Sequence, residues 1–339
     1  MVALISIPMA VYNGENFLHR SLQSVLNQDS PNWELICIND GSTDSSAAIL
    51  EHYSKNDRRI KVISQNNSGP ARARIQGYRV ASGDFIFTGL DQDDYLAPDF
   101  VSSMAQAVDR MDVDVLLCDW MIEQDDGKFT SFIAKNGFKV GQVFEGVEAF
   151  KLTFPWRLHA IGLWSKSLSQ RFATDAQHAF NNYDSEEYLG RLIFLNSKKI
   201  AIGPGRYFHC RNEDSITTKP SLKKLQSLDT NERLVRLART HRLGSEVLWQ
   251  IFMYQRNYLA NIMRMLGSFK NRETSHLGIA SASRTCREFL KSLKCEIRQN
   301  PNDLKISRLK SESIILKLEL RYALMKINIF INKHLSRPH

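Results

Sequence analysis

The sequence lacks several common signatures of binding and catalysis. Its five cysteines include no Cys-x-x-Cys pair, which argues against a disulfide framework or a zinc site and favours a reducing cytoplasm. It has no GxGxxG fingerprint and no GxxxxGK[ST] loop, which excludes two common nucleotide-binding motifs. No run approaches about 18 apolar residues and no basic leader opens the chain, so we expect neither a transmembrane helix nor a signal peptide.

The charge is unevenly distributed along the 339 residues, a length that allows two domains. From Lys219 onward there are 24 Lys and Arg against 9 Asp and Glu, whereas the preceding residues hold 21 against 27. An acidic front part is thus joined to a basic tail. This asymmetry predicts an anionic partner for the tail, either a membrane surface or nucleic acid. Nucleic acid is disfavoured because the tail shows no aromatic stacking platform.

Strand-like and helix-like segments alternate over the first ~120 residues, which predicts a parallel, doubly wound α/β sheet. The expected strands are Ala3–Ile7 (ended by Pro8), Trp33–Ile38, Lys61–Ser64, a run from Phe85 and Val113–Cys118. Polar loops at Tyr12, Asp40 and Asp91 each follow a strand. We expect these loops to gather at one edge of the sheet, where such folds bind ligands. Residues 121–218 are less regular.

The run that begins at Phe85 ends in three carboxylates, Asp91, Asp93 and Asp94. An Asp-x-Asp pair places two carboxylates on the same side of an extended segment. Such oxygen ligands suit Mg²⁺ or Mn²⁺, which complete their coordination with substrate phosphates and water. The alternative is an acidic loop that caps the next helix.

A second acidic group, Asp184, Glu186 and Glu187, opens an amphipathic helix. Carboxylates in a first helical turn also occur simply as partners of the helix dipole. Beyond Lys219 the pattern is helical. Its last segment, Ile314–Leu335, mixes apolar and basic residues and predicts an interfacial helix; the alternatives are a helix packed on the domain or a homodimer contact.

Short motifs follow one another in a fixed order over about residues 1–218. They are Pro8-x-x-x-Tyr12-Asn13, Asn39-Asp40-Gly41-Ser42-Thr43-Asp44, Asn67-x-Gly69-x-Ala71-Arg72, Gly83-Asp84, Asp91-Gln92-Asp93-Asp94, Ser185-Glu186-Glu187 and Arg211-x-x-x-Ser215-Ile216-Thr217. This order resembles glycosyltransferase family 2, the inverting sugar transferases with a GT-A fold. The DxDD form is similar to bacterial enzymes that build O-antigen, capsule or lipopolysaccharide repeats.

The resemblance implies a GT-A domain over residues 1–218, with a nucleotide-sugar half at about 1–120 and an acceptor half at about 121–218. Residues 219–339 would form a basic helical region that associates with the inner face of the cytoplasmic membrane. The implied substrates are a UDP-sugar donor and a lipid-diphosphate-linked or lipopolysaccharide-type saccharide acceptor.

The resemblance also assigns roles to particular residues. The donor would be bound by Pro8, Tyr12, Asn13, Asp40, Asn67, Arg72, Asp91, Gln92, His209 and Arg211, with Asp40 accepting the uracil N3–H. Asp93 and Asp91 would hold Mn²⁺ or Mg²⁺. The catalytic base would be Glu187, Glu186 or Asp184, in that order, because the Glu-Asp pair usual in the family is Glu-Glu here. A nucleotidyltransferase and a non-catalytic sugar-binding protein are the competing hypotheses.

Overall fold

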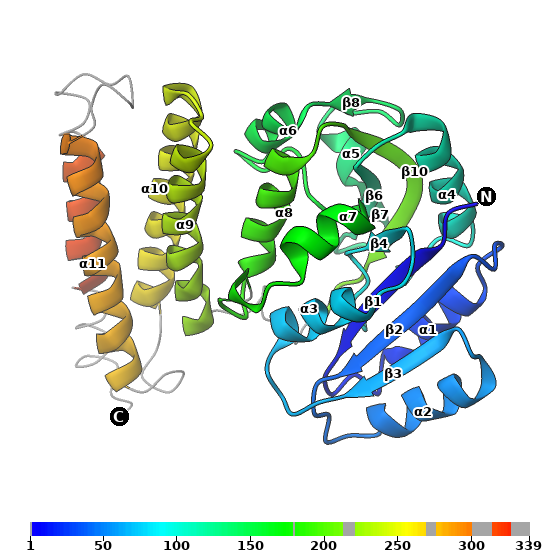
Figure 1. Cartoon of the computed structure of the whole chain (residues 1–339). Helices are drawn as coiled ribbons and strands as arrows, with labels where there is room; N and C mark the ends of the chain where they lie inside the picture. The colour runs from blue at the N-terminus through cyan, green and yellow to red at the C-terminus, as the bar shows by residue number, and fades with distance from the viewer. Residues whose placement is uncertain (1, 179, 213–220, 269–275, 300–313, 327–339) are drawn as a thin grey trace. The chain divides into compact units, whose positions relative to one another are not determined.

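The computed structural model describes the chain except for residues 1, 179, 213–220, 269–275, 300–313 and 327–339 (Figure 1). The chain divides into two compact units, Met1–Ser215 and Ile216–His339. The first unit contains the sheet and the second is helical, so each is described by itself.

The first unit is built on one mixed sheet with the strand order β3-β2-β1-β4-β9-β6-β10-β5. Its strands are β1 Ile5–Val11, β2 Trp33–Asn39, β3 Ile60–Ser64, β4 Phe85–Phe87, β5 Tyr95–Leu96, β6 Val115–Glu123, β7 Phe129–Ser131, β8 Val143–Phe144, β9 Gly162–Ser165 and β10 Ile200–His209. Strands β3, β2, β1 and β4 are mutually parallel, and β6 is parallel to β10. The predicted mostly parallel sheet flanked by helices is confirmed.

The helices of this unit follow the strands closely in the first half of the chain. They are α1 Leu18–Leu26, α2 Ser46–Asn56, α3 Pro70–Val80, α4 Phe100–Met111, α5 Phe132–Lys135, α6 Gly146–Leu152, α7 Lys166–Leu168, η1 Ser169–Ala173, η2 Ala176–His178 and α8 Ser185–Asn196. Alternate side chains of β1, from Ile5 to Val11, lie in one buried cluster with apolar residues of α1 and α4. The opposite face of β1 packs against α3, where Pro8 meets Gly77.

Strand β1 is longer than the sequence predicts, because Pro8 does not end it. Pro8 pairs with Ile36 in the parallel ladder, and the pairing continues to Val11. On the other side, β4 pairs with β1 only at Ile5 and Ser6. Beyond Ser6 that side of β1 has no ladder partner, so a residue without an N–H is tolerated there.

The sequence did not predict strand β9, nor the short strands β5, β7 and β8. Strand β9 comes from the irregular middle of the chain and inserts between β4 and β6, antiparallel to both. Gly162 is essential to this position, because a Cβ there would lie 2.3 Å from the carbonyl oxygen of Leu116. A four-residue strand has too short a pattern to separate it from a loop by periodicity.

The second unit contains η3 Leu222–Leu225, α9 Gln226–Thr240, α10 Ser245–Ser268, α11 His276–Gln299 and a helix over residues 314–326. Apolar side chains of α10, α11 and residues 314–326 share one buried cluster. In the part of the chain that the structure describes, no helix is long and apolar enough to cross a membrane. The carboxyl-terminal part of the predicted Ile314–Leu335 helix lies outside the described residues.

Glu34 on β2 is a buried carboxylate in the parallel half of the sheet. Its carboxylate accepts hydrogen bonds from Ser6 Oγ (2.5 Å), Ser82 N (2.6 Å), Ser82 Oγ (2.8 Å) and Lys61 Nζ (2.6 Å). Burial alone would raise the pKa of Glu34, but these four bonds outweigh burial and lower it to about 2. The network ties together β1, β2, β3 and the turn before β4.

We predict that Glu34 makes the stability of this unit depend on pH. Because the folded pKa is about 2 and the ordinary value is 4.5, the stabilisation is complete above about pH 4.5 and is lost as the pH falls towards 2. Glu34→Gln should lower the free energy of unfolding at neutral pH by about 2–3 kcal/mol and by much less near pH 2. Denaturant titrations at several pH values measure this. The exposed Glu51→Gln on α2 is the control; an equal loss in both variants would contradict the prediction.

Candidate functional site

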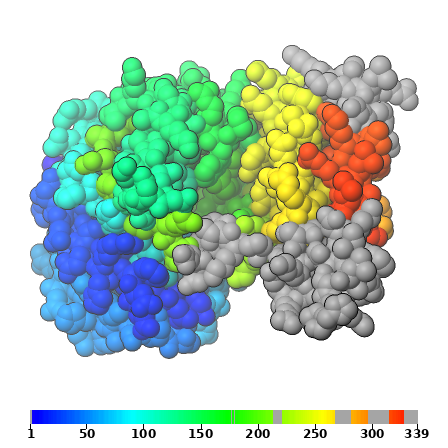
Figure 2. Space-filling view, turned by 180° about the vertical axis from the view of Figure 1, so that it is seen from behind, coloured from blue at the N-terminus to red at the C-terminus, as the bar shows by residue number. Residues whose placement is uncertain are grey.

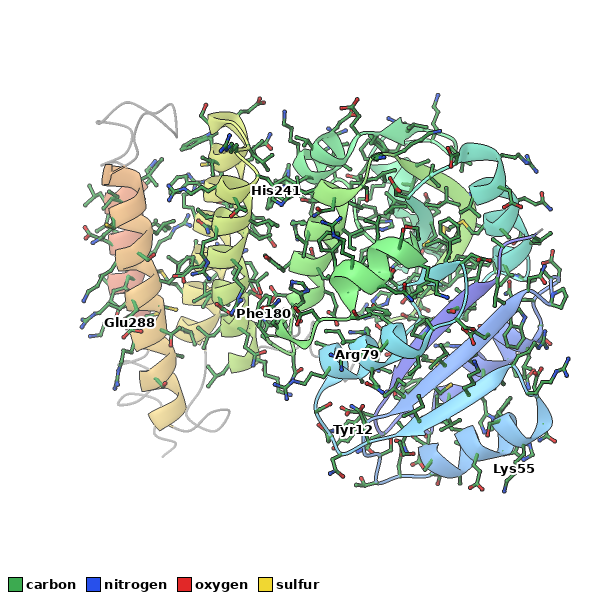
Figure 3. The ribbon with its side chains drawn as sticks, in the orientation of Figure 1. Tyr12, Lys55, Arg79, Phe180, His241 and Glu288 are labelled. Atoms are coloured by element: carbon green, nitrogen blue, oxygen red, sulfur yellow. The ribbon has the colours of Figure 1, made fainter. Side chains whose placement is uncertain are left out.

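The loops that follow β1, β2 and β4 meet at the carboxyl ends of these strands. Tyr12 N donates to Gln92 Oε1 (2.9 Å), and Gln92 Nε2 donates back to the carbonyl of Tyr12 (3.1 Å). Asn13 Oδ1 accepts from Thr43 N at 2.8 Å. Figure 3 labels the Tyr12 ring at this end of the sheet, where the residue is 48% exposed. The three loops therefore form one polar surface.

Asp40 is buried and fixes the turn that begins α3. Its Oδ1 accepts hydrogen bonds from Ser68 N (2.9 Å) and Gln65 Nε2 (2.7 Å), and a longer one from Ser68 Oγ (3.2 Å). Its Oδ2 accepts from Gly69 N at 2.8 Å. Gly69 has φ +91°, and a Cβ there would lie 2.3 Å from the side chain of Asn182. The turn thus needs glycine both for its backbone conformation and for its contact with the segment before α8.

Arg74 on α3 joins two acidic motifs that lie far apart in the sequence. Its guanidinium forms ion pairs with Asp91, after β4, and with Glu186, in the first turn of α8. Burial alone would lower the pKa of Arg74, but the two carboxylates outweigh burial and hold it well above its usual value. Arg72 is the arginine of α3 that the sequence motif predicted for this role. Arg72 is exposed on α3, so Arg74 is the arginine that faces the acidic motifs.

The remaining aspartates of the DxDD motif have different surroundings. Asp93 is part-buried and accepts a hydrogen bond from Asn212 Nδ2 at 2.9 Å. Asp94 is fully buried and accepts from Tyr207 Oη, from Cys210 N (2.8 Å) and from His209 Nδ1 (3.1 Å). Asp94 therefore anchors the end of β10 to the loop. Asp91 and Asp93 are the aspartates of this motif that retain some exposure.

His209 is held by Asp94 and packs beside Trp120, with 5.6 Å between the ring centroids. Burial alone would lower the pKa of His209, but its hydrogen bond to Asp94 and the nearby carboxylates raise it above the ordinary value. The side chain is 38% exposed. His209 thus places an imidazole ring close to the DxDD loop.

Glu187 is oriented by two residues that the sequence analysis did not single out. Its Oε2 accepts from Arg191 Nη1 (2.6 Å), one helical turn further along α8, and from Trp156 Nε1 (3.2 Å). Arg191 is buried, while Trp156 is 36% exposed, has φ +62° and lies edge-on to Trp120. A bulky residue at positive φ is a strained exception of the kind found near functional sites. Glu187 and Arg191 are four residues apart on a predicted helix, and this spacing could have predicted their ion pair from the sequence.

The remaining residues predicted for the site lie as follows in the structure. Pro8 is buried against α3, about three residues before the strand end, so its side chain packs in the fold and not on the polar surface. Asn67 is exposed in the turn that Asp40 fixes. Asp184 is the N-cap of α8 and accepts from Asn181 Nδ2 at 3.2 Å. The Ser215-Ile216-Thr217 motif lies outside the described residues.

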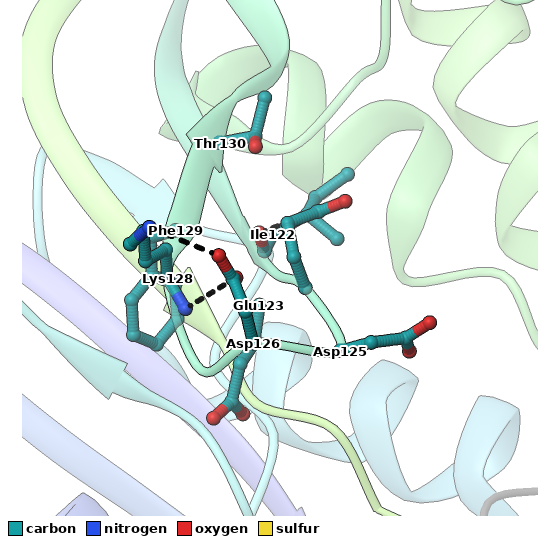
Figure 4. Close-up of a pocket in the computed structure, with 8 residues that line it drawn as sticks. Ile122, Glu123, Asp125, Asp126, Lys128, Phe129 and Thr130 are labelled. Atoms are coloured by element: carbon teal, nitrogen blue, oxygen red, sulfur yellow. Dashed lines mark hydrogen bonds and ion pairs between the residues drawn. The ribbon is translucent and has the colours of Figure 1, made fainter.

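Arg211 is tied to the β6–β7 hairpin. Its guanidinium pairs with Asp125, and its backbone N–H donates to Glu123 Oε2 at 2.8 Å. Both acidic residues line a hollow of about 630 Å³ at this hairpin (Figure 4). The charge of Arg211 is therefore already paired with a neighbouring carboxylate.

Comparisons with known proteins found similar sequences and a similar fold. Residues 6–158 match the model of the family described as "Glycosyl transferase family 2". Glycosyltransferase GlyA of Streptococcus pneumoniae is 27% identical over 201 residues, which are 58% of this chain and 29% of that protein. Putative glycosyltransferase EpsH of Bacillus subtilis is 35% identical over 176 residues, which are 45% of this chain and 51% of that protein.

A crystal structure of S. aureus TarS 1-349 in complex with UDP-GlcNAc is similar with a TM-score of 0.53 at 17% identity, covering 97% of this chain and 89% of that one. This likeness establishes the GT-A type fold. The matched residues and the relatives support an assignment of residues 6–158 to glycosyltransferase family 2. The chain spans less than two thirds of the length of either relative.

Proposed function

We propose that the protein is an inverting, metal-dependent glycosyltransferase that moves a sugar from a UDP-sugar to a lipid-linked saccharide of a bacterial surface polysaccharide. The observation that carries the proposal is the pairing of Arg74 with both Asp91 and Glu186. It brings the acidic end of β4 and the acidic start of α8 to one cation. A donor site and a catalytic base would have to lie this close together for sugar transfer.

The donor would bind on the polar surface at the carboxyl ends of β1, β2 and β4. Tyr12, Asn13 and Gln92 would form the wall of the nucleotide site. Asp40 Oδ1 already accepts three hydrogen bonds, whereas Oδ2 accepts one from Gly69. Because each carboxylate oxygen has two lone pairs, Oδ2 is the atom with room for the uracil N3–H. The complex of TarS with UDP-GlcNAc, a protein of the same fold, supports a UDP-sugar donor.

Asp91 and Asp93 would hold Mn²⁺ or Mg²⁺. No cluster of three or more metal-ligating side chains occurs among the described residues. Two carboxylates nevertheless fit these ions, which commonly use one or two protein carboxylates together with substrate phosphates. When bound, the ion would neutralise charge on the diphosphate. Arg74 would orient Asp91 and add positive charge, the task that the sequence analysis gave to Arg72. His209 would contribute a further hydrogen-bonding group beside the motif.

Glu187 is our choice for the base, ahead of Glu186 and Asp184. The acceptor hydroxyl oxygen would bond to the anomeric carbon as the bond from that carbon to the UDP oxygen breaks, and Glu187 would take the hydroxyl proton. Arg191 and Trp156 both bind Oε2, which leaves Oε1 to receive the proton. Glu186, in contrast, is paired with Arg74.

The basic region beyond residue 218 would hold the enzyme at the anionic inner membrane surface, where a lipid-linked acceptor resides. Electrostatic attraction supplies ~1 kcal/mol for each Lys or Arg near such a surface.

A screen of UDP-sugars for UDP release, with Mn²⁺, Mg²⁺ or EDTA, tests the proposed reaction. We expect release with at least one UDP-sugar, and we expect EDTA to abolish it because the diphosphate charge is then uncompensated. Release of inorganic diphosphate in place of UDP would identify a nucleotidyltransferase. No turnover of any UDP-sugar with either metal would reject the proposal and leave a binding protein.

The two arginines of α3 give a matched pair. Arg74→Gln should lower kcat/KM for the donor by about 100-fold, because Asp91 and Glu186 would then face each other without a cation. Arg72→Gln, two residues away and exposed, should change it by less than about threefold. Steady-state UDP release measures both. Equal losses, or a larger loss for Arg72→Gln, would contradict the assignment.

The base is tested by removing its charge alone. Glu187→Gln should lower kcat by about 10²–10⁴-fold with little change in donor affinity. The control is Glu148→Gln, an equivalent change in the first turn of α6. If Glu187→Gln keeps its activity while Glu186→Gln or Asp184→Asn loses it, the base is one of those residues instead.

A further inference from the structure

The helix over residues 314–326 is apolar on two opposite sides. Its inner side lies in the buried cluster shared with α10 and α11, through Ile314, Ile315, Leu318 and Met325. Its outer side carries Leu316, Leu320 and Leu324, which are 56%, 57% and 58% exposed. We call these three residues the leucine row. Figure 2 shows this helix in red on the surface of the second unit.

The spacing of the leucine row makes it a continuous stripe. Residues four apart on a helix differ by only ~40° around the axis, so the three side chains follow one line. Contacts on the inner side fix which way the stripe faces: Glu319 pairs with Lys294 of α11, and the Tyr322 ring lies 5.8 Å from the guanidinium of Arg287. Single exposed leucines are common on proteins, but a row of three indicates an interaction surface.

Basic side chains border the leucine row. Lys317, Arg321 and Lys326 are exposed on the same helix. The acidic residue of the helix, Glu319, is already paired with Lys294. Arg256 of α10 adds to this charge: burial and then the nearby guanidinium of Arg321 lower the pKa of Arg256. Arg256 and Arg321 are therefore like charges close together beside the leucines, an arrangement that anions would stabilise.

We propose that the leucine row and its basic border dock on an anionic lipid bilayer. The leucines would enter the boundary between headgroups and acyl chains, and Lys317, Arg321 and Arg256 would reach the lipid phosphates. A second copy of the chain fits less well, because pairing two leucine rows would bring like charges together. The purpose of this surface rests on the proposed function, since it would bring the enzyme to a lipid-linked acceptor, but binding itself requires no sugar transfer.

The test is co-sedimentation of the full chain with vesicles of phosphatidylcholine, with and without phosphatidylglycerol, at low and high salt. We expect binding to the anionic vesicles that weakens with salt. Leu316→Ser/Leu320→Ser/Leu324→Ser should reduce the partition coefficient by about tenfold or more. Lys317→Gln/Arg321→Gln should reduce it by about tenfold and remove part of its salt dependence. The control is Val140→Ser/Val143→Ser/Val147→Ser, which removes exposed apolar side chains of the first unit and should leave binding unchanged.

Circular dichroism and light scattering accompany these measurements. If the leucine variant does not fold, the Lys317→Gln/Arg321→Gln variant decides the question, because it leaves the apolar side chains in place. Wild-type binding that neither variant weakens would overturn the proposal. So would a wild-type dimer that the leucine variant converts to a monomer while vesicles bind neither form; the row would then be a homodimer contact. Vesicle binding without UDP release would support this docking surface and reject the proposed transferase. UDP release without vesicle binding would support the transferase and reject the docking surface.

Discussion

The candidate site depends on one part-buried guanidinium. Arg74 lies between Asp91 and Glu186 and so connects the end of β4, helix α3 and the start of α8. Removing this cation would leave two part-exposed carboxylates close together without the charge that pairs them. Arg74 can reach them because Asp40 fixes the Gly69 turn from which α3 begins. The hydrogen bonds of Asp40, at the end of β2, thereby help to place Arg74 between Asp91 and Glu186.

Burial separates the roles of neighbouring carboxylates in the DxDD motif. Asp94 is fully buried, and its three donors all come from β10 or the residue after it, so it holds the fold together. Asp91 and Asp93 keep part of their surface exposed and are the ones open to a ligand. Glu186 and Glu187 also differ in their surroundings, because Glu186 pairs with Arg74 and Glu187 pairs with Arg191. Identical residue types thus receive different tasks from the groups around them.

The sequence predicted the parallel half of the fold well because its strands and helices are long enough to show periodicity. Strand β9 has four residues and could not be recognised, although it separates β4 from β6. The choice between Arg72 and Arg74 was also beyond the sequence. Residues two apart on a helix point in nearly opposite directions, ~200° apart, so one must face inward, but only the packing of α3 shows which. Trp156 was missed because its position depends on an irregular loop.

The division of charge along the chain gives the two units different relations to a bilayer. The residues before Lys219 hold more acidic than basic side chains, so an anionic surface would repel them at the range of the Debye length. The proposed UDP-sugar donor is also an anion, and in the acidic first unit it would depend on a local cation, Arg74. The second unit has more basic than acidic side chains, so its attraction to an anionic surface would offset the repulsion of the first unit. An enzyme with a membrane-borne acceptor and an anionic soluble donor would need these two properties on separate parts of the chain.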